Sequence, residues 1–355
     1  MSGEREPRIL IIGAGPTGLG AGYRLQELGY ENWTILEAND YVGGLATSFT
    51  DEAGFTYDIG GHVMFSHYDY YDQLVDKLMD GEFTELQREA WVWMQDRFIP
   101  YPFQNNIRDL DAQTVFECVS GLVRAQRQEH HPTNFREWVD GVMGEGIAKH
   151  FMIPYNFKVW ATPAELMSFQ WIGERVSIVD VDEILRNVIL GEDQVSWGPN
   201  NTFKYPLRGG TGFLYDGLRG FVEDHLELET AVASVDSDAR EVRTTDGRRW
   251  PYDVLLSTMP LNRLVECIEH VPDGVRTAVG GLHWSGSHIV GVGVDRPADT
   301  SKNWIYFPEP EVPFYRVTYL SNYSPYITPE PDQTLLLTET SRSAHKHEDE
   351  ATIVD

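Results

Sequence analysis

The sequence lacks several features that define whole classes of protein. Only two of its 355 residues are cysteine, Cys118 and Cys267, so a disulfide framework is not expected and a reducing compartment is. No apolar run approaches the roughly 20 residues of a membrane-spanning helix. The polar start MSGEREPR carries no signal-peptide pattern. We therefore expect a cytoplasmic protein without a membrane partner.

Positive charge, and lysine in particular, is also scarce. The chain has 28 basic residues against 55 acidic ones, a formal net charge of -27, and only six of the basic residues are lysine. Such a surface disfavours nucleic acid and anionic membranes as partners. It is also typical of proteins that work in molar salt, where charge is screened over about 3 Å. We expect a halophilic protein, and an ordinary acidic protein is the alternative.

What is present fits a globular protein of two or three domains, with 41% hydrophobic residues over 355 positions. Residues 8–12 (RILII) predict a buried strand, GAGPTGLG opens a predicted helix, and residues 33–38 (WTILEA) predict the next strand. This βαβ pattern predicts an α/β fold with a Rossmann-like domain. Residues 106–193 have a mostly helical pattern, and long aromatic strands after residue 283 predict an antiparallel sheet.

The motif Gly13-x-Gly15-x-x-Gly18 lies between the first strand and its helix. The first glycine permits a tight turn, the second lets the backbone approach a pyrophosphate, and the third allows close packing of helix on strand. Glu37 ends the next strand, where a carboxylate can hold ribose hydroxyls. The spacing predicts a dinucleotide site. A glycine-rich turn that serves packing alone is the alternative.

A second glycine pair distinguishes FAD from NAD. Gly43-Gly44-Leu45 follows soon after Glu37, and the combination resembles the FAD-binding opening of the glutathione-reductase-type flavoproteins, which include the amine and porphyrinogen oxidases. A third pair precedes His62 in YDIGGHVMFSHY. A tight turn needs the glycines but not the histidine, so His62 is a functional candidate. A packing histidine is the alternative.

One subfamily resembles the chain over most of its length, from about residue 8 to residue 341. A series of blocks is similar, in order, to the UDP-galactopyranose mutases of the eukaryotic type: GAGPTGLGAGYRL, YDIGGHVMFSHY, YPFQNNI, PYNFKVWA, GERV, WGPN, RGGTG, LLSTM, YFPE and FYRVTYLSNYSPY. The resemblance implies an isomerase that interconverts UDP-galactopyranose and UDP-galactofuranose. It implies a reduced-FAD N5–sugar adduct, no net redox, and an external reductant such as NAD(P)H.

The resemblance also assigns residues to the flavin. In that family the Gly-Gly-His loop lies against the isoalloxazine ring, which implies Gly61 and His62 as flavin contacts and His62 as a catalytic residue. The full set of expected cofactor residues is Gly13, Gly15, Gly18, Glu37, Gly43, Gly44, Leu45, Gly61, His62 and Val232.

A UDP-sugar needs an aromatic slot for uracil, donors for the pyrophosphate and a polar sugar pocket. The YPFQ block offers Tyr101, Phe103 and Gln104 as a stacking face and an amide for the base. Arg175 and Arg316 are candidate pyrophosphate clamps, because guanidinium forks match phosphate oxygens. The resemblance makes Arg316 a catalytic candidate as well. The other expected substrate residues are Tyr155, Asn156, Trp160, Asn200, Trp304 and Tyr306. Core packing is the alternative for each aromatic, and a structural ion pair is the alternative for Arg175.

Two other interpretations stay open. The chain could be an FAD-dependent amine- or porphyrinogen-type oxidoreductase, which would need an apolar cavity. It could also be a non-catalytic truncated fragment, because the family pattern continues beyond residue 355. We expect an FAD-binding domain at 1–88 and 203–265 that lacks its C-terminal part, a helical substrate domain at 104–202, an antiparallel sheet domain at 89–103 and 280–342, and the start of a truncated helix at 343–355. No metal site is expected, and an oligomer stays open.

Overall fold

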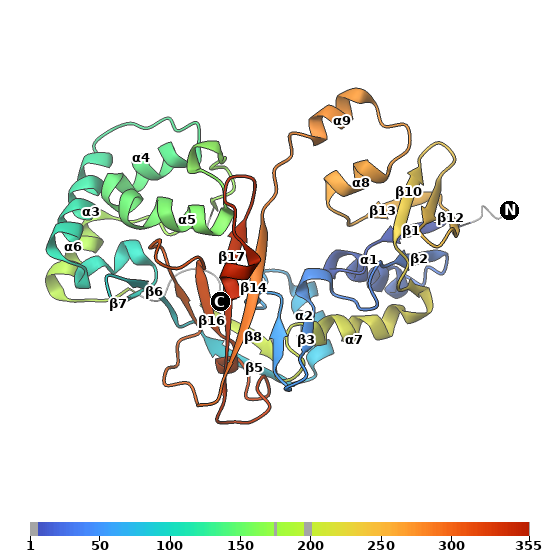
Figure 1. The fold of residues 1–355 in the computed structure, drawn as a ribbon, viewed down its shortest axis with the longest axis horizontal. Coiled ribbons are helices and arrows are strands. Elements are labelled where there is room, and N and C mark those ends of the chain that lie inside the picture. Colours follow the sequence, from blue (N-terminus) through green and yellow to red (C-terminus); the bar gives the residue numbers. More distant parts are fainter. Residues whose placement is uncertain (1–5, 174–175, 195–200, 355) are drawn as a thin grey trace. The chain divides into compact units, whose positions relative to one another are not determined.

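The computed structural model describes residues 6–173, 176–194 and 201–354. The chain divides into two compact units, whose elements are labelled in Figure 1. The first unit comprises Met1–Asp51, Ser66–Phe83 and Pro206–His283, and the second comprises Glu52–Phe65, Thr84–Tyr205 and Trp284–Asp355. The second unit contains the expected helical segment and the expected antiparallel-sheet segments except residues 280–283.

A four-stranded parallel sheet forms the centre of the first unit, in the order β13-β1-β2-β9. Its strands are β1 (Ile9–Ile12), β2 (Trp33–Leu36), β9 (Leu226–Glu227) and β13 (Val254–Ser257). The helix α1 (Pro16–Glu27) connects β1 to β2, and Ile11, Leu19 and Ile35 are completely buried in the core it shares with the sheet. The α/β part of the predicted fold class is therefore confirmed.

An antiparallel meander and further helices complete the first unit. These elements are β3 (Ser48–Thr50), α2 (Asp69–Met79), α7 (Gly212–Val222), β10 (Val232–Asp236), β11 (Glu241–Thr244), β12 (Arg249–Pro251), α8 (Leu261–Cys267) and α9 (Asp273–Val279). The strands β10, β11 and β12 pair in that order. The helix α7 packs against α1, where the rings of Tyr23 and Phe221 meet edge to face at 5.3 Å.

A six-stranded sheet forms the centre of the second unit, in the order β14-β17-β16-β15-β6-β7. Its strands are β6 (Ala90–Met94), β7 (Arg97–Pro100), β14 (Gly286–Val294), β15 (Trp304–Tyr306), β16 (Arg316–Tyr319) and β17 (Thr334–Arg342). All neighbouring pairs are antiparallel except β15 and β6, which run parallel. The predicted antiparallel sheet is confirmed with that one exception. Its register places Arg316 directly between Tyr306 and Glu339.

Apart from short 3-10 turns, the remaining elements that the structure describes are mostly helical. They are β4 (Thr56–Asp58), β5 (Phe83–Gln87), α3 (Ala112–Ala125), α4 (Phe135–Ile147), the π-helical turn η4 (Ala148–Met152), α5 (Ile153–Trp160), α6 (Val181–Leu190), β8 (Thr202–Pro206) and α10 (Glu350–Val354). Among the described residues, no helix combines the length and apolarity needed to cross a membrane. Within the same residues, no group of three or more His, Cys, Asp or Glu side chains could hold a metal ion.

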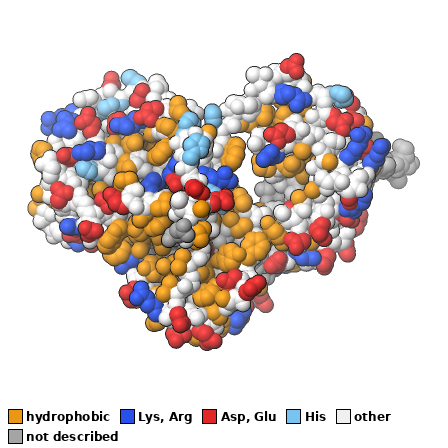
Figure 2. Space-filling view, viewed as in Figure 1, with side chains coloured by type: hydrophobic (Ala, Val, Ile, Leu, Met, Phe, Trp, Pro, Cys, Tyr) orange, Lys and Arg blue, Asp and Glu red, His pale blue; other side chains and the backbone are white. Residues whose placement is uncertain are grey.

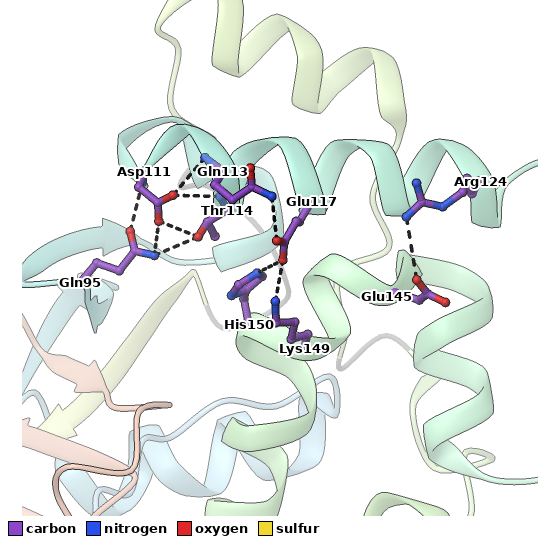
Figure 3. Close-up of polar contacts among 9 residues, drawn as sticks. All are labelled: Gln95, Asp111, Gln113, Thr114, Glu117, Arg124, Glu145, Lys149 and His150. Atoms are coloured by element: carbon purple, nitrogen blue, oxygen red, sulfur yellow. Dashed lines mark hydrogen bonds and ion pairs between the residues drawn. The ribbon is translucent and has the colours of Figure 1, made fainter.

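Polar contacts hold α3 in the helical part of the second unit (Figure 3). The carboxylate of Asp111 caps α3 by accepting hydrogen bonds from the N–H groups of Gln113 and Thr114, both at 3.0 Å. Glu117, farther along α3, lies 2.8 Å from both Lys149 and His150 in η4. These contacts tie the helix to the π-helical turn.

Cys118 lies on the buried face of α3 and is completely buried. Burial, reinforced by the neighbouring Glu117 carboxylate, raises the pKa of its thiol to about 12. The residue is therefore a packed, protonated thiol in a structural position.

Candidate functional site

A cavity of about 500 Å³ lies in the first unit, at the carboxyl ends of β1, β2 and β13. Ligands bind at this edge in open α/β sheets. The predicted cofactor residues that line it are Gly13, Gly15, Glu37, Gly44, Leu45 and Val232. Sequence reasoning missed other lining residues, among them Thr230 and Thr258, which follow later strands and carry no motif.

The three glycines of the motif have different surroundings. A Cβ atom on Gly18 would lie 1.8 Å from the carbonyl oxygen of Gly13, so only glycine lets α1 approach this turn. Gly13 has a φ of +99°, and a Cβ there would lie 2.3 Å from Oγ1 of Thr258. A Cβ on Gly15, the N-cap residue of α1, would meet no atom within 4 Å. The backbone at Gly15 is therefore open to a ligand.

Glu37 fixes the chain around the cavity. Its Oε2 accepts a hydrogen bond from the N–H of Ala14 at 2.7 Å, and its Oε1 accepts from the N–H and Nδ2 of Asn39 at 2.9 and 2.8 Å. A carboxylate offers about four acceptor sites, so capacity remains for a ribose hydroxyl. The second glycine pair packs on the same turn, since the N–H of Gly43 donates to the carbonyl of Ala14 at 2.9 Å.

These features fit the dinucleotide part of FAD. The N-terminus of α1 carries unpaired N–H groups and a positive dipole end, with no acidic side chain in its first turn. Such a terminus binds a pyrophosphate. The cavity beside it ends at Glu37, which has the chemistry required for the ribose.

The second unit contains a buried ion pair between Arg316 in β16 and Glu339 in β17. Their side chains are 23% and 4% exposed. Nε of Arg316 donates to Oε1 of Glu339 at 2.7 Å, and Nη2 donates to Oε2 at 2.8 Å. Burial alone would lower the pKa of Arg316 and raise that of Glu339. The opposite charge nearby outweighs burial, so the pKa of Arg316 is raised and that of Glu339 is lowered. Both groups are charged.

The same ion pair holds the backbone that precedes His62. The N–H of Gly61 donates to Oε1 of Glu339 at 3.1 Å, and Nη2 of Arg316 donates to the carbonyl of Gly61 at 3.3 Å. The hydroxyl of Tyr315 donates to Oε2 of Glu339 at 2.6 Å. Nδ1 of His62 is buried and has no hydrogen-bond partner among the described residues. The two predicted catalytic residues, His62 and Arg316, are thus linked through Gly61.

Three of the predicted tyrosines meet beside Arg316. The ring centroid of Tyr306 lies 5.1 Å from that of Tyr101 and 5.2 Å from that of Tyr155. The indole N–H of Trp304 donates to the Tyr306 hydroxyl at 2.7 Å. Burial raises the pKa of all three tyrosine hydroxyls. They are therefore neutral groups that can donate hydrogen bonds next to a fixed positive charge.

Phe103 and Gln104 lie deeper than a solvent-facing slot would require. Phe103 is completely buried and stacks on Phe151 at a centroid distance of 4.6 Å. Gln104 is 2% exposed, and its Nε2 donates to the carbonyl of Ser177 at 2.8 Å. Its Oε1 is buried and has no partner in the described part of the chain. Their role toward a base stays a prediction, and the unpaired oxygen is one feature in its favour.

The remaining predicted substrate residues have separate positions. Nδ2 of Asn156 donates to the carbonyl of Met152 at 2.7 Å, and its Oδ1 accepts from the indole N–H of Trp160 at 3.2 Å. Trp160 as a whole residue is 41% exposed. Arg175 and Asn200 lie outside the described residues.

Sequence reasoning missed Glu339 and Arg88. Glu339 is the one charged residue among the leucine, threonine and serine residues of TLLLTETS, and a single carboxylate in such a strand was the available signal. Arg88 is 8% exposed, and its guanidinium carbon lies 5.9 Å from the ring centroid of Tyr101. Arg88 is a single arginine between two strands, and nothing in the surrounding sequence indicated that it would be buried near the tyrosines.

The chain is similar in sequence to known flavin-dependent oxidases. The family described as flavin containing amine oxidoreductase matches residues 16–355. The chain is 50% identical over 44 residues to polyamine oxidase 7 of Oryza sativa subsp. japonica, covering 12% of this chain and 9% of that protein. It is 23% identical over 273 residues to a probable flavin-containing monoamine oxidase A of Dictyostelium discoideum, covering 71% and 57%. The chain thus spans less than two thirds of the length of these curated relatives.

A solved structure matches more closely. The crystal structure of a reduced UDP-galactopyranose mutase is similar to this chain with a TM-score of 0.95 and 43% sequence identity. The match covers 98% of this chain and 77% of that one. The resemblance that the sequence blocks predicted is therefore confirmed.

Proposed function

The chain belongs to the flavin-containing amine oxidoreductases, and from that premise we propose that it is an isomerase that interconverts UDP-galactopyranose and UDP-galactofuranose. The observation that carries this proposal is the likeness to a reduced UDP-galactopyranose mutase, at a TM-score of 0.95 and 43% identity. Oxidation of an amine or a porphyrinogen is the second candidate, because the curated relatives include amine oxidases.

FAD is the cofactor, and the cavity of the first unit fits it. When bound and reduced, FAD supplies the nucleophile for the anomeric carbon of the sugar through its N5, without net redox. The N-terminus of α1 binds the pyrophosphate and Glu37 binds the ribose. The other residues proposed for FAD in this unit are Gly13, Gly15, Gly18, Gly43, Gly44, Leu45 and Val232. Gly61 and His62 keep the flavin roles that the resemblance predicts.

The substrate groups lie in the second unit. Arg316 supplies a fixed positive charge for the pyrophosphate, and the hydroxyls of Tyr101, Tyr155 and Tyr306 supply neutral donors beside it. The unpaired oxygen of Gln104 supports a role in binding the base, since buried polar atoms are rarely left without a partner. Arg316 also keeps UDP in place between its departure from the sugar and its return.

The first test separates the isomerase from the oxidase. We expect sugar interconversion to require prior reduction of the protein by dithionite or NAD(P)H, and to consume no reductant per turnover. Product chromatography with and without reductant measures both quantities. Stoichiometric oxidation of an amine or porphyrinogen substrate would instead establish the second candidate.

The second test concerns the cofactor. Gly15→Val places a branched side chain where the backbone must meet the pyrophosphate, while the free protein has room for it. We expect the purified variant to lose flavin absorbance and to melt at the same temperature as wild type from which the flavin has been removed. Gly20→Val is the matched control, because a Cβ at Gly20 also meets no atom within 4 Å. A colourless wild type would support the hypothesis of a non-catalytic fragment.

The acidic surface suits a cytoplasm of high salt, and we include both cytoplasmic location and salt adaptation in the proposal. Figure 2 shows acidic side chains spread over the visible face of both units. With a net charge of -27, self-repulsion destabilises the protein when ionic strength is low. Molar KCl shortens the screening distance to about 3 Å, so we expect the melting temperature to rise across a salt series. A flat series would remove the halophilic part of the proposal.

A further inference from the structure

The guanidinium of Arg316 already has an acceptor inside the protein. Its Nε–Nη2 edge, the edge suited to a two-pronged contact with a phosphate, faces Glu339 at 2.7 and 2.8 Å. The sheet register sets the two residues directly opposite each other. Nη1 of Arg316 has no hydrogen-bond partner among the residues that the structure describes. Only this end of the guanidinium remains for a ligand.

Glu339 also fixes the turn before His62. One carboxylate, 4% exposed, accepts from Arg316, from the N–H of Gly61 at 3.1 Å and from the hydroxyl of Tyr315 at 2.6 Å. A Cβ on Gly61 would lie 3.4 Å from both Nη2 of Arg316 and Oε1 of Glu339, so the turn packs closely on the ion pair. The phosphate-binding charge and the Gly61 turn therefore share one anchor.

This arrangement weakens the attraction of Arg316 for an anion. A pyrophosphate that approaches the guanidinium also meets the Glu339 carboxylate, and like charges repel across the same short distance. A bare, buried guanidinium would bind UDP more tightly. Tighter binding of the ground state does not raise turnover. A reaction in which UDP leaves the sugar and returns to it needs UDP to be held near the sugar without being fixed to the guanidinium.

We propose that Glu339 is a positioning residue, which restrains Arg316 so that only its Nη1 end meets the pyrophosphate and which ties Gly61 to the same ion pair. This role presupposes the proposed function, in which UDP is the leaving and returning group. Glu339 then lowers the affinity for UDP and raises the turnover number.

Glu339→Gln tests the restraint, because it keeps the size of the side chain and removes its charge. By titration calorimetry we expect the variant to bind UDP about tenfold more tightly, a change of about 1.4 kcal/mol. We expect kcat to fall by at least about tenfold. A residue needed only for folding would weaken both quantities. UDP affinity that is unchanged or weaker, or an unchanged kcat, overturns the proposal. A wild type that binds no UDP overturns the proposed function instead.

Hydrogen–deuterium exchange gives a second readout that needs neither UDP nor flavin. Glu339→Asp keeps the charge but shortens the reach to Gly61. We expect faster exchange in a peptide that covers residues 57–64. Unchanged exchange overturns the anchoring of Gly61, and this result stands even where Glu339→Gln does not fold.

Glu241→Gln is the matched control for these variants. Glu241 is also a strand glutamate that pairs with arginine, at 3.1 Å from Arg243 and 3.7 Å from Arg249. It belongs to the β11 strand of the first unit and has no part in the proposed site. We expect it to leave UDP affinity, kcat and exchange at Gly61 unchanged, and a change like that of Glu339→Gln would overturn the specific role of Glu339.

Discussion

The cavity around Gly15 leaves binding capacity free for a ligand, whereas the charged groups around Arg316 are already paired with each other. In the first unit, open backbone at a helix N-terminus and a glutamate with spare acceptor capacity face about 500 Å³ of space. In the second unit, a cation and an anion bind each other and a backbone turn. Ligand affinity and protein stability are therefore separable in the first site and joined in the second.

The largest effect should come from breaking the ion pair. Arg316→Ala leaves the Glu339 carboxylate buried without its cation, which should cost about 3–5 kcal/mol in the free energy of unfolding. It should also weaken UDP binding by about 1.5–3 kcal/mol, since one charge-assisted contact is lost. Urea denaturation and titration calorimetry measure the two quantities.

The double variant Arg316→Met/Glu339→Leu separates these two losses. It replaces both charges with apolar groups, so part of the lost stability should return while UDP binding stays weak. The remainder stays lost, because the N–H of Gly61 and the hydroxyl of Tyr315 no longer have an acceptor in Glu339. Arg316→Lys should recover only part of the affinity, because an ammonium cannot form the fork. An Arg316→Ala variant as stable as wild type would remove the contrast between the two sites.

The next largest effect should come from Gly18, and it tests whether a residue of the first site contributes to the stability of the protein. A methyl on Gly18 would press on the carbonyl of Gly13, so Gly18→Ala should lose about 3 kcal/mol of unfolding free energy. Gly20→Ala lies one half-turn away on the same helix with open space around it, and it should gain up to about 1 kcal/mol. Urea denaturation of both variants measures the two changes in unfolding free energy. Equal stability of the two would mean that α1 can shift away from the turn.

A smaller effect is expected at Gly61. A methyl there would lie 2.8 Å from Oγ1 of Thr318, a side-chain atom that can move more easily than backbone. Gly61→Ala should therefore cost about 1–2 kcal/mol of stability and loosen the turn before His62. Thr318→Ala removes the clashing oxygen, so the double variant should recover most of the loss. Additive losses in denaturation experiments would show that Thr318 is not the obstacle.

The difference between the two sites also explains which of their contacts could be predicted from the sequence. The βαβ unit, the glycine motif and Glu37 lie within about thirty residues, where local spacing determines which atoms meet. The contact between Gly61 and Glu339 spans 278 residues, and Arg316 meets Glu339 only because β16 and β17 pair in one register. The arginine was predicted from chemistry and resemblance, but its partner was not, because a lone glutamate in a strand does not reveal what lies opposite. The parallel pairing of β15 with β6 was missed for the same reason.

The smallest effect is the dependence of stability on pH. It follows from the direction in which folding shifts the pKa of Glu339. Burial alone would raise this pKa, but Arg316, Tyr315 and the Gly61 amide lower it below the value of about 4.3 for an unfolded chain. A carboxylate with a lowered folded pKa contributes stability that is present above the unfolded pKa and lost as pH falls through the folded one. The free energy of unfolding of wild type should therefore exceed that of Glu339→Gln by a constant amount from about pH 7 to about pH 5. This difference should then shrink below about pH 4.3, by no more than about 1.4 kcal/mol per pH unit. Urea denaturation of both proteins from about pH 7 to about pH 3.5 measures the difference. A difference that stays constant to the acid end would mean that the ion pair does not hold this carboxylate ionised, and the second site would then be no more tightly paired than the first.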